Sequence, residues 1–169
     1  NQKEVRLTWG EVEFIYNGVN QLPTATATGL VNNDECLVTV TGEKVNVGEY
    51  EATASSLSNS NYKLPVNVTK GFEIKKAQLT VTANDEEVTY GDLAPSYTVT
   101  YNGFVNNETK EVLGGELSFA CEYEKTSNVG NYDIVASGYP SDNYLITYVN
   151  WIIKVNLNEL GLTWGEVEF

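Results

Sequence analysis

The chain has 169 residues, of which 41% are hydrophobic, and its 10 basic and 23 acidic side chains give a net charge of −13. A chain this acidic is repelled by phosphate backbones and anionic lipid, so nucleic acid and membrane surfaces are poor partners for it. It contains no histidine, which removes Ser-His-Asp and Cys-His catalysis and most catalytic zinc sites.

Identical residues open and close the sequence. Residues 7–14 read Leu-Thr-Trp-Gly-Glu-Val-Glu-Phe, and residues 162–169 read the same. Identity of this length at a fixed distance predicts a repeat array. We therefore expect residues 158–169 to be the opening strand segment of a further repeat.

A second duplication lies inside the chain. Asn-Val-Gly-Glu-Tyr at 46–50 matches Asn-Val-Gly-Asn-Tyr at 128–132, and Gly-Leu-Val-Asn-Asn-Asp at 29–34 matches Gly-Phe-Val-Asn-Asn-Glu at 103–108. These matches predict two homologous domains in tandem. The predicted divisions of the chain are residues 1–76, 77–157 and 158–169.

Alternation of apolar and polar residues with a period of two predicts strands throughout both domains. In the first domain the expected strands are residues 5–9, 12–16, 24–28, 36–42, 49–55 and 72–76. In the second domain they are residues 79–83, 88–90, 97–101, 117–123, 132–137 and 144–155. Gly48 and Gly130 are expected in turns that lead into two of these strands, with positive φ.

Only residues 107–113 have the pattern of a helical turn, with Gly114 and Gly115 ending it. The prediction is therefore an all-β protein made of two tandem small β-rich domains. An immunoglobulin-like sandwich is favoured because the first domain offers no helix, and a β-grasp-like fold is the alternative.

Several motifs together resemble the MBG family of the YGX type. They are Leu-Thr-Val-Thr-Ala at 79–83, Tyr-Gly-Asp at 90–92, Pro95, the duplicated segments that end at 108 and 132, and Asn-Tyr at 143–144, which matches Asn-Tyr at 61–62. The first domain has Tyr-Asn-Gly at 16–18 in place of Tyr-Gly-Asp. The resemblance implies a β-rich module of a bacterial cell-surface or secreted adhesin-like protein, with no catalytic residues and no defined ligand site.

Acidic and aromatic residues supply the candidate binding sites of this sequence. Ca²⁺ ligands could come from Asp85, Glu86, Glu87 and Asp92, or from Glu108, Glu111 and Glu116, but no EF-hand or RTX spacing accompanies them, and a solvated acidic face is the simpler interpretation. Trp9, Trp151 and Trp164 could stack on sugars, although packing explains the duplicated Trp9 and Trp164 more simply. No catalytic, cofactor or metal residue is assigned, and the protein is expected not to be an enzyme.

Lysines and cysteines raise two questions of covalent structure. Lys75 and Lys154 are candidates for a Lys–Asn crosslink assisted by a buried acid. Cys36 and Cys121 fall in different predicted domains and are expected not to form a disulfide with each other.

The sequence thus predicts a non-catalytic structural or interaction module of an extracellular, cell-surface or secreted repeat protein, such as an adhesin stalk or spacer. The alternative is a carbohydrate-binding accessory module of a secreted glycan-degrading enzyme. Expected partners are neighbouring repeats and host or matrix glycans or proteins. Nucleic acid, membrane insertion and cofactors are not expected. Self-association through residues 162–169 is a further expectation, since exposed strands invite pairing.

Overall fold

The computed structural model describes residues 1–159, and it is all-β, as predicted. Within that part of the chain the one helical element is a 3₁₀ turn, η1 (Lys110–Val112), inside the predicted segment 107–113. The predicted opening segment of a further repeat lies almost wholly outside the described residues. Its pairing therefore stays a prediction.

The chain forms two compact units. Unit 1 comprises Asn1–Leu79, Gly103–Leu113 and Pro140–Leu145, and unit 2 comprises Thr80–Asn102, Gly114–Tyr139 and the residues from Ile146 onward. We call residues 1–76 the first repeat and residues 77–157 the second repeat. Two loops of the second repeat therefore belong to unit 1, while the boundary after residue 76 stays a prediction.

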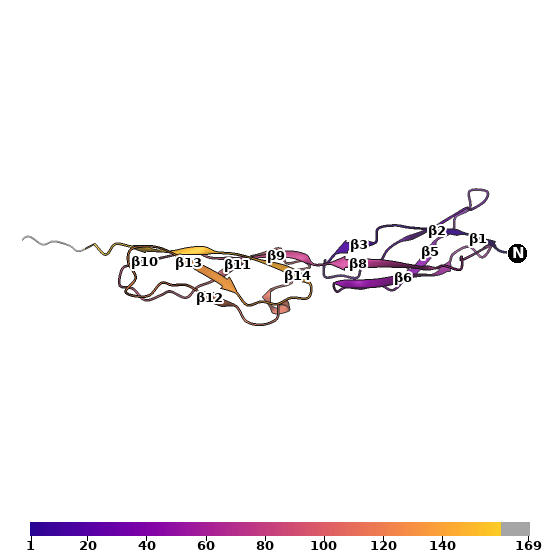
Figure 1. The fold of residues 1–169 in the computed structure, drawn as a ribbon. Coiled ribbons are helices and arrows are strands. Elements are labelled where there is room, and N and C mark those ends of the chain that lie inside the picture. Colours follow the sequence, from indigo (N-terminus) through magenta and orange to yellow (C-terminus); the bar gives the residue numbers. More distant parts are fainter. Residues whose placement is uncertain (160–169) are drawn as a thin grey trace, which may run out of the picture. The chain divides into compact units, whose positions relative to one another are not determined.

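The first repeat is made of eight strands (Figure 1). They are β1 (Lys3–Glu4), β2 (Arg6–Trp9), β3 (Glu13–Ile15), β4 (Ala25–Thr28), β5 (Val38–Thr41), β6 (Gly48–Leu57), β7 (Tyr62–Lys63) and β8 (Thr69–Lys75). Four of them form a sheet of order β3-β8-β6-β5, and two-stranded sheets pair β2 with β4 and β1 with β7. Between these sandwich-like sheets lie the buried side chains Val5, Ala27, Ala52, Ala54, Phe72 and Ile74.

The second repeat uses the same order of elements. Its strands are β9 (Ala77–Ala83), β10 (Glu86–Thr89), β11 (Val99–Asn102), β12 (Ser118–Ala120), β13 (Gly130–Ser137), β14 (Tyr144–Val149) and β15 (Trp151–Asn156). A four-stranded sheet of order β10-β15-β13-β12 accompanies a three-stranded sheet of order β11-β9-β14. The core of unit 2 is a cluster of Ala83, Tyr123, Ile134, Ala136, Ile153 and Val155.

The register of the larger sheets confirms the duplication. Tyr50 on β6 pairs with Phe72 on β8, and Tyr132 on β13 pairs with Ile153 on β15. Gly48 and Gly130 begin the equivalent strands β6 and β13 with φ of 157° and 153°, so their predicted positive φ is confirmed. Equivalent residues of the two repeats thus have equivalent backbone environments.

Each predicted strand overlaps an observed one, with one correction. Residues 144–155 were predicted as a single strand, and this is wrong, because the chain passes at Asn150 from β14 in one sheet to β15 in the other. The apolar alternation runs through both strands and does not reveal the crossing. The sequence did not predict the paired strands β1 and β7, because a strand of two residues is too short to show an alternation of apolar and polar residues.

Candidate functional site

The matched segments at 29–34 and 103–108 form the same tight loop. Asn32 and Asn33 have φ of 53° and 58°, and Asn106 and Asn107 have 51° and 57°. Asparagine is among the few residues that adopt this left-handed conformation readily, which explains the Asn-Asn pair. In each loop the N–H of the acidic residue donates to the valine carbonyl three residues earlier, at 2.9 Å.

A buried tyrosine fastens each loop. In the first repeat the Tyr62 hydroxyl accepts from the Val31 N–H at 3.0 Å and donates to Asp34 Oδ2 at 2.8 Å. In the second repeat the Tyr144 hydroxyl accepts from the Val105 N–H at 3.1 Å and donates to Glu108 Oε2 at 2.5 Å. In both repeats the matched acid and the matched tyrosine therefore hold the loop together.

Glu108 makes a further contact, with the first repeat. The Tyr16 hydroxyl donates to Glu108 Oε1 at 2.6 Å, so each carboxylate oxygen accepts one phenol. The Tyr16 and Tyr144 rings meet edge to face at 5.5 Å between centroids, and Phe104 meets Tyr144 in the same way. None of the ion pairs among residues 1–159 involves Glu108.

Burial, followed by the hydrogen bond to Glu108, raises the pKa of Tyr16 to about 12. The same two causes raise the pKa of Tyr144 to about 12. Both phenols are therefore protonated donors at neutral pH. This arrangement suits a fixed hydrogen-bonded clasp, because neither group exchanges a proton near neutrality.

Polar contacts around this clasp join the same segments. The Val47 N–H donates to Asn143 Oδ1 at 3.0 Å, Asn143 Nδ2 donates to Asn46 Oδ1 at 3.1 Å, and Asn106 Nδ2 donates to the Gly18 carbonyl at 3.0 Å. We call these contacts and the clasp the junction. Its residues are Tyr16, Gly18, Asn46, Val47, Asn106, Glu108, Asn143 and Tyr144. All of them lie in unit 1.

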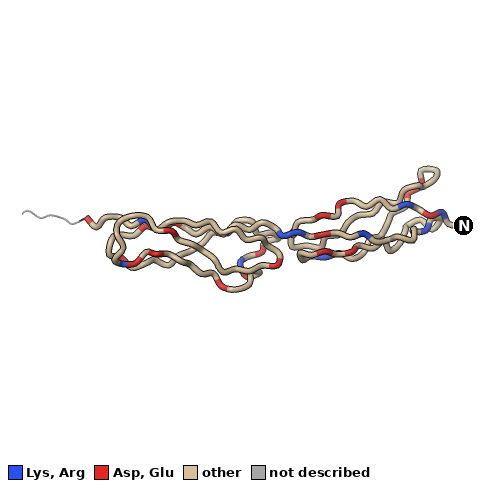
Figure 2. Tube along the Cα trace, viewed as in Figure 1, with Lys and Arg blue, Asp and Glu red and all other residues tan. Residues whose placement is uncertain are grey.

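The acidic candidates for Ca²⁺ are not assembled into one group. Glu87 pairs with Lys154 at 3.3 Å, and Asp92 Oδ2 accepts from the Thr89 N–H at 2.9 Å within its own turn. Glu108 belongs to the junction, whereas Glu111 and Glu116 are exposed. No group of three or more potential metal ligands is present among residues 1–159. Figure 2 shows acidic residues spread along the trace.

The crosslink candidates both lie on the surface. Lys75 Nζ is 2.8 Å from Glu13 and 3.7 Å from Glu73. Lys154 Nζ is 3.3 Å from Glu87, whose other oxygen accepts from Asn156 Nδ2 at 3.5 Å. Lysine, asparagine and an acidic residue are the three residue types that a Lys–Asn crosslink uses. However, the Lys154 and Glu87 side chains are 53% and 65% exposed, whereas the predicted chemistry needs a buried acid.

The tryptophans differ in exposure. Trp9 is partly buried on β2, and Trp164 lies outside the described residues. Trp151 is 45% exposed and lines a hollow of about 430 Å³ in unit 2, together with Asp85, Glu86, Glu87, Asp133, Asn150, Ile152 and Lys154. At the equivalent position in the first repeat, two residues before the core residue Phe72, stands the exposed Lys70. The fold therefore does not require an aromatic side chain here.

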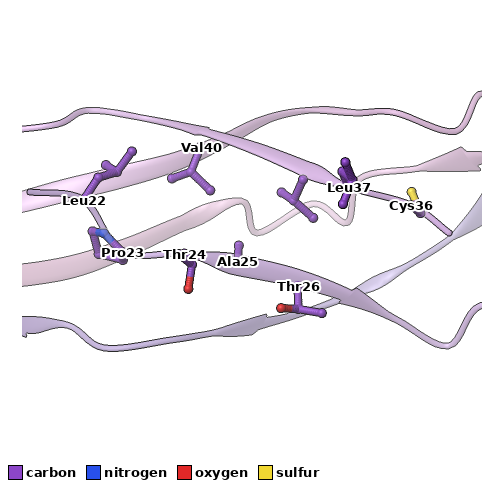
Figure 3. A pocket seen from close by; sticks show the side chains of 9 residues that line it. Leu22, Pro23, Thr24, Ala25, Thr26, Cys36, Leu37 and Val40 are labelled. Atoms are coloured by element: carbon purple, nitrogen blue, oxygen red, sulfur yellow. The ribbon is translucent and has the colours of Figure 1, made fainter.

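An apolar groove of about 430 Å³ lies between β4 and β5 of unit 1 (Figure 3). Leu22, Pro23 and Ala25 lie on one side of it, and Leu37 and Val40 on the other, with Cys36 at one end. In the second repeat Tyr97 and Phe119 pack together at 5.7 Å at the corresponding place. Cys36 is buried, Cys121 is partly buried, and both are free thiols.

The importance of Glu108 was missed from the sequence, where it was grouped with the solvated acids. The signal was available in the duplication itself, because an acid ends the loop segment in both repeats and an Asn-Tyr pair follows in both. What the sequence lacked was any indication that Tyr16 and this loop lie in one unit.

Two tandem all-β repeats, each with an Asn-Asn loop fastened by a buried tyrosine, define a modular repeat protein. The family model for the MBG domain (YGX type) matches residues 8–71 and residues 79–151. The chain therefore belongs to this family and contains two copies of the domain, which confirms the resemblance inferred from its motifs. The search of curated proteins gives no match. No helix among residues 1–159 is long and apolar enough to cross a membrane.

Proposed function

We propose that the chain is a non-catalytic structural module of an extracellular, cell-surface repeat protein, where it serves as a spacer within an adhesin-like array. The observation that carries this proposal is the junction. Tyr16 of the first repeat and Glu108 of the second are joined by a partly buried hydrogen bond of 2.6 Å. A spacer needs a link between successive repeats, and within unit 1 the junction fastens two loops of the second repeat to the first.

Family and charge give additional support. Tandem domains of one family suit an array, and a net charge of −13 favours solubility over association with anionic surfaces. The junction phenols of Tyr16 and Tyr144 stay protonated at neutral pH, so both remain hydrogen-bond donors there.

Antibody labelling of cells that produce the protein tests the location. Antibodies raised against the folded chain should label intact cells without permeabilisation. Labelling that appears only after permeabilisation would contradict the proposal.

A second candidate function, glycan binding by unit 2, is favoured by Trp151. An exposed indole ring beside carboxylates and the Asn150 amide is a combination that stacks on and hydrogen-bonds a sugar. A glycan array separates the two functions. A spacer should bind no glycan, whereas a binding module should bind one class of glycan and lose it in Trp151→Ala but not in Trp9→Phe.

A further inference from the structure

The chain carries each half of the junction a second time, and among residues 1–159 these second halves have no partner of the kind that the junction supplies. Register identifies them. The Tyr16 N–H donates to the Lys75 carbonyl after β3, and the Tyr90 N–H donates to the Asn156 carbonyl after β10. Tyr90 is thus the counterpart of Tyr16, and by the matched segments Asn128 and Val129 are the counterparts of Asn46 and Val47.

The first half, which we call the tyrosine face, consists of Tyr90, Asn128 and Val129 in unit 2. In the junction Tyr16 is 5% exposed and Val47 is partly buried, but Tyr90 and Val129 are each 46% exposed. The Tyr90 hydroxyl makes no hydrogen bond to any of residues 1–159. This face therefore exposes an apolar pair and a donor that the junction buries.

The second half, the carboxylate face, consists of Val31, Asn32, Asp34 and Asn61 in unit 1. Asp34 Oδ2 accepts from Tyr62, as Glu108 Oε2 accepts from Tyr144, but within the described chain Asp34 Oδ1 has no counterpart of Tyr16. Val31 is 44% exposed, whereas its counterpart Val105 is partly buried. Asn61 is exposed, whereas Asn143 is bonded to Asn46 and Val47.

We propose that the tyrosine face of one chain binds the carboxylate face of a second copy, head to tail, and reproduces the junction between molecules. The occupant is specified by the chain itself. The residues that would meet across the new contact are the duplicates of residues that already meet in unit 1. Because the two faces differ, the contact is heterologous, so each added copy keeps one face available for the next until a ring closes, and association does not stop at a symmetric dimer.

This inference rests on the proposed function, since it extends the connection between repeats beyond one molecule. It deepens that function by naming the partner. The two can fail separately. If copies of the chain do not associate but Tyr16→Phe still lowers the free energy of unfolding of unit 1, only this inference is overturned, and the assigned role of the junction within the chain is unaffected.

Sedimentation equilibrium of the full chain tests the proposal, at protein concentrations up to roughly 1 mM, where weak contacts are populated. Salt of roughly 0.5 M screens the repulsion between acidic copies. Wild type should form a concentration-dependent series of oligomers. A protein that stays monomeric up to the highest concentration overturns the proposal.

Two variants block one face each: Val129→Asp blocks the tyrosine face and Val31→Asp blocks the carboxylate face. Each alone should weaken association at least about tenfold, because every contact needs both faces. Their mixture should form a one-to-one dimer and nothing larger, since one good face of each kind remains. The proposal is overturned if the mixture of the two variants does not associate, or if either variant alone associates as strongly as wild type.

Control variants distinguish loss of the contact from three other causes: disrupted folding, added charge and association through the terminal segment. Thr147→Asp adds the same charge at an exposed strand position of β14 and should leave association unchanged. The conservative variants Tyr90→Phe and Asp34→Asn should weaken it without a fold-disrupting charge. Trp164→Asp should have no effect. If Trp164→Asp abolishes association, the terminal segment mediates it and the proposal fails.

Discussion

The Tyr16 hydroxyl donates to Glu108 Oε1 at 2.6 Å, although 92 residues separate the two in sequence. Tyr144 occupies the other carboxylate oxygen, so Glu108 holds two buried phenols of different repeats. Hydrogen bonds to a charged group are worth more than those between neutral groups, and here both donors are 5% exposed or less. Glu108 therefore joins a tyrosine of the first repeat to a tyrosine of the second.

Tyr16→Phe should lower the free energy of unfolding of unit 1 by about 1.5–3 kcal/mol, because it removes a hydrogen bond to a charged acceptor and keeps the ring. The measurement is urea denaturation, with amide hydrogen exchange in β3 and β8 as the readout for unit 1. Tyr90→Phe is the matched control. Tyr90 is 46% exposed, and the expected change is within about 0.5 kcal/mol. Equal effects of both variants would contradict the assigned role of the junction.

Alkaline pH should destabilise unit 1 through the two phenols of the clasp. Tyr16 and Tyr144 have folded-state pKa values of about 12, above the ordinary value of 10.0, so the folded state retains protons that the unfolded state gives up. The stability they contribute is complete below pH 10 and is lost as the pH rises toward 12. Melting temperatures across this range measure the loss. Glu108→Gln should make the decline shallower, and an unchanged slope would count against the clasp.

Gly48→Ala should cost more stability than Gly130→Ala. Both glycines have similar positive φ, so both substitutions carry a backbone penalty of about 1 kcal/mol. A Cβ at Gly48 would lie 2.8 Å from the Tyr50 hydroxyl oxygen, whereas a Cβ at Gly130 would meet no described atom within 4 Å. Thermal melts of the two variants compare the steric term directly. Equal losses would mean that Tyr50 moves aside freely.

Because the first repeat has a groove (Figure 3) where the second has a packed ring, substitutions at equivalent positions should change the stability in opposite directions. Val40 pairs with Ala54 and Phe119 pairs with Ala136, so the two are counterparts on the core face. Val40→Phe should fill part of the groove and stabilise the protein by about 0.5–1 kcal/mol, whereas Phe119→Val should destabilise it by about 1–2 kcal/mol. Thermal denaturation of both variants, with exposed Thr39→Phe as control, checks this. A destabilising Val40→Phe would show that the groove is too rigid to accept a ring.

Thiol labelling should distinguish the two cysteines. Cys121 is partly buried beside a hollow that Ala120 and Val135 also line, whereas Cys36 is buried in the core of the first repeat. Native protein should therefore react at Cys121 first, and mass spectrometry before and after reduction should show the same mass. A mass increase on reduction of the monomer would reveal a disulfide and contradict the assignment of free thiols.

The sequence by itself determined the all-β class, the duplication and nearly every strand. Alternation over five or more residues, as around Tyr50 and Tyr132, is set by the pleat and needs no distant partner. The sequence also matched the loop segments 29–34 and 103–108 to each other. Only the tertiary structure decided what the loops are for. Tyr16 and Glu108 meet because two distant segments pack in one unit, and no local pattern encodes that distance. The break at Asn150 was hidden for the same reason: an unbroken alternation fits one long strand or two strands in different sheets, and only the packing of both sheets chooses between them.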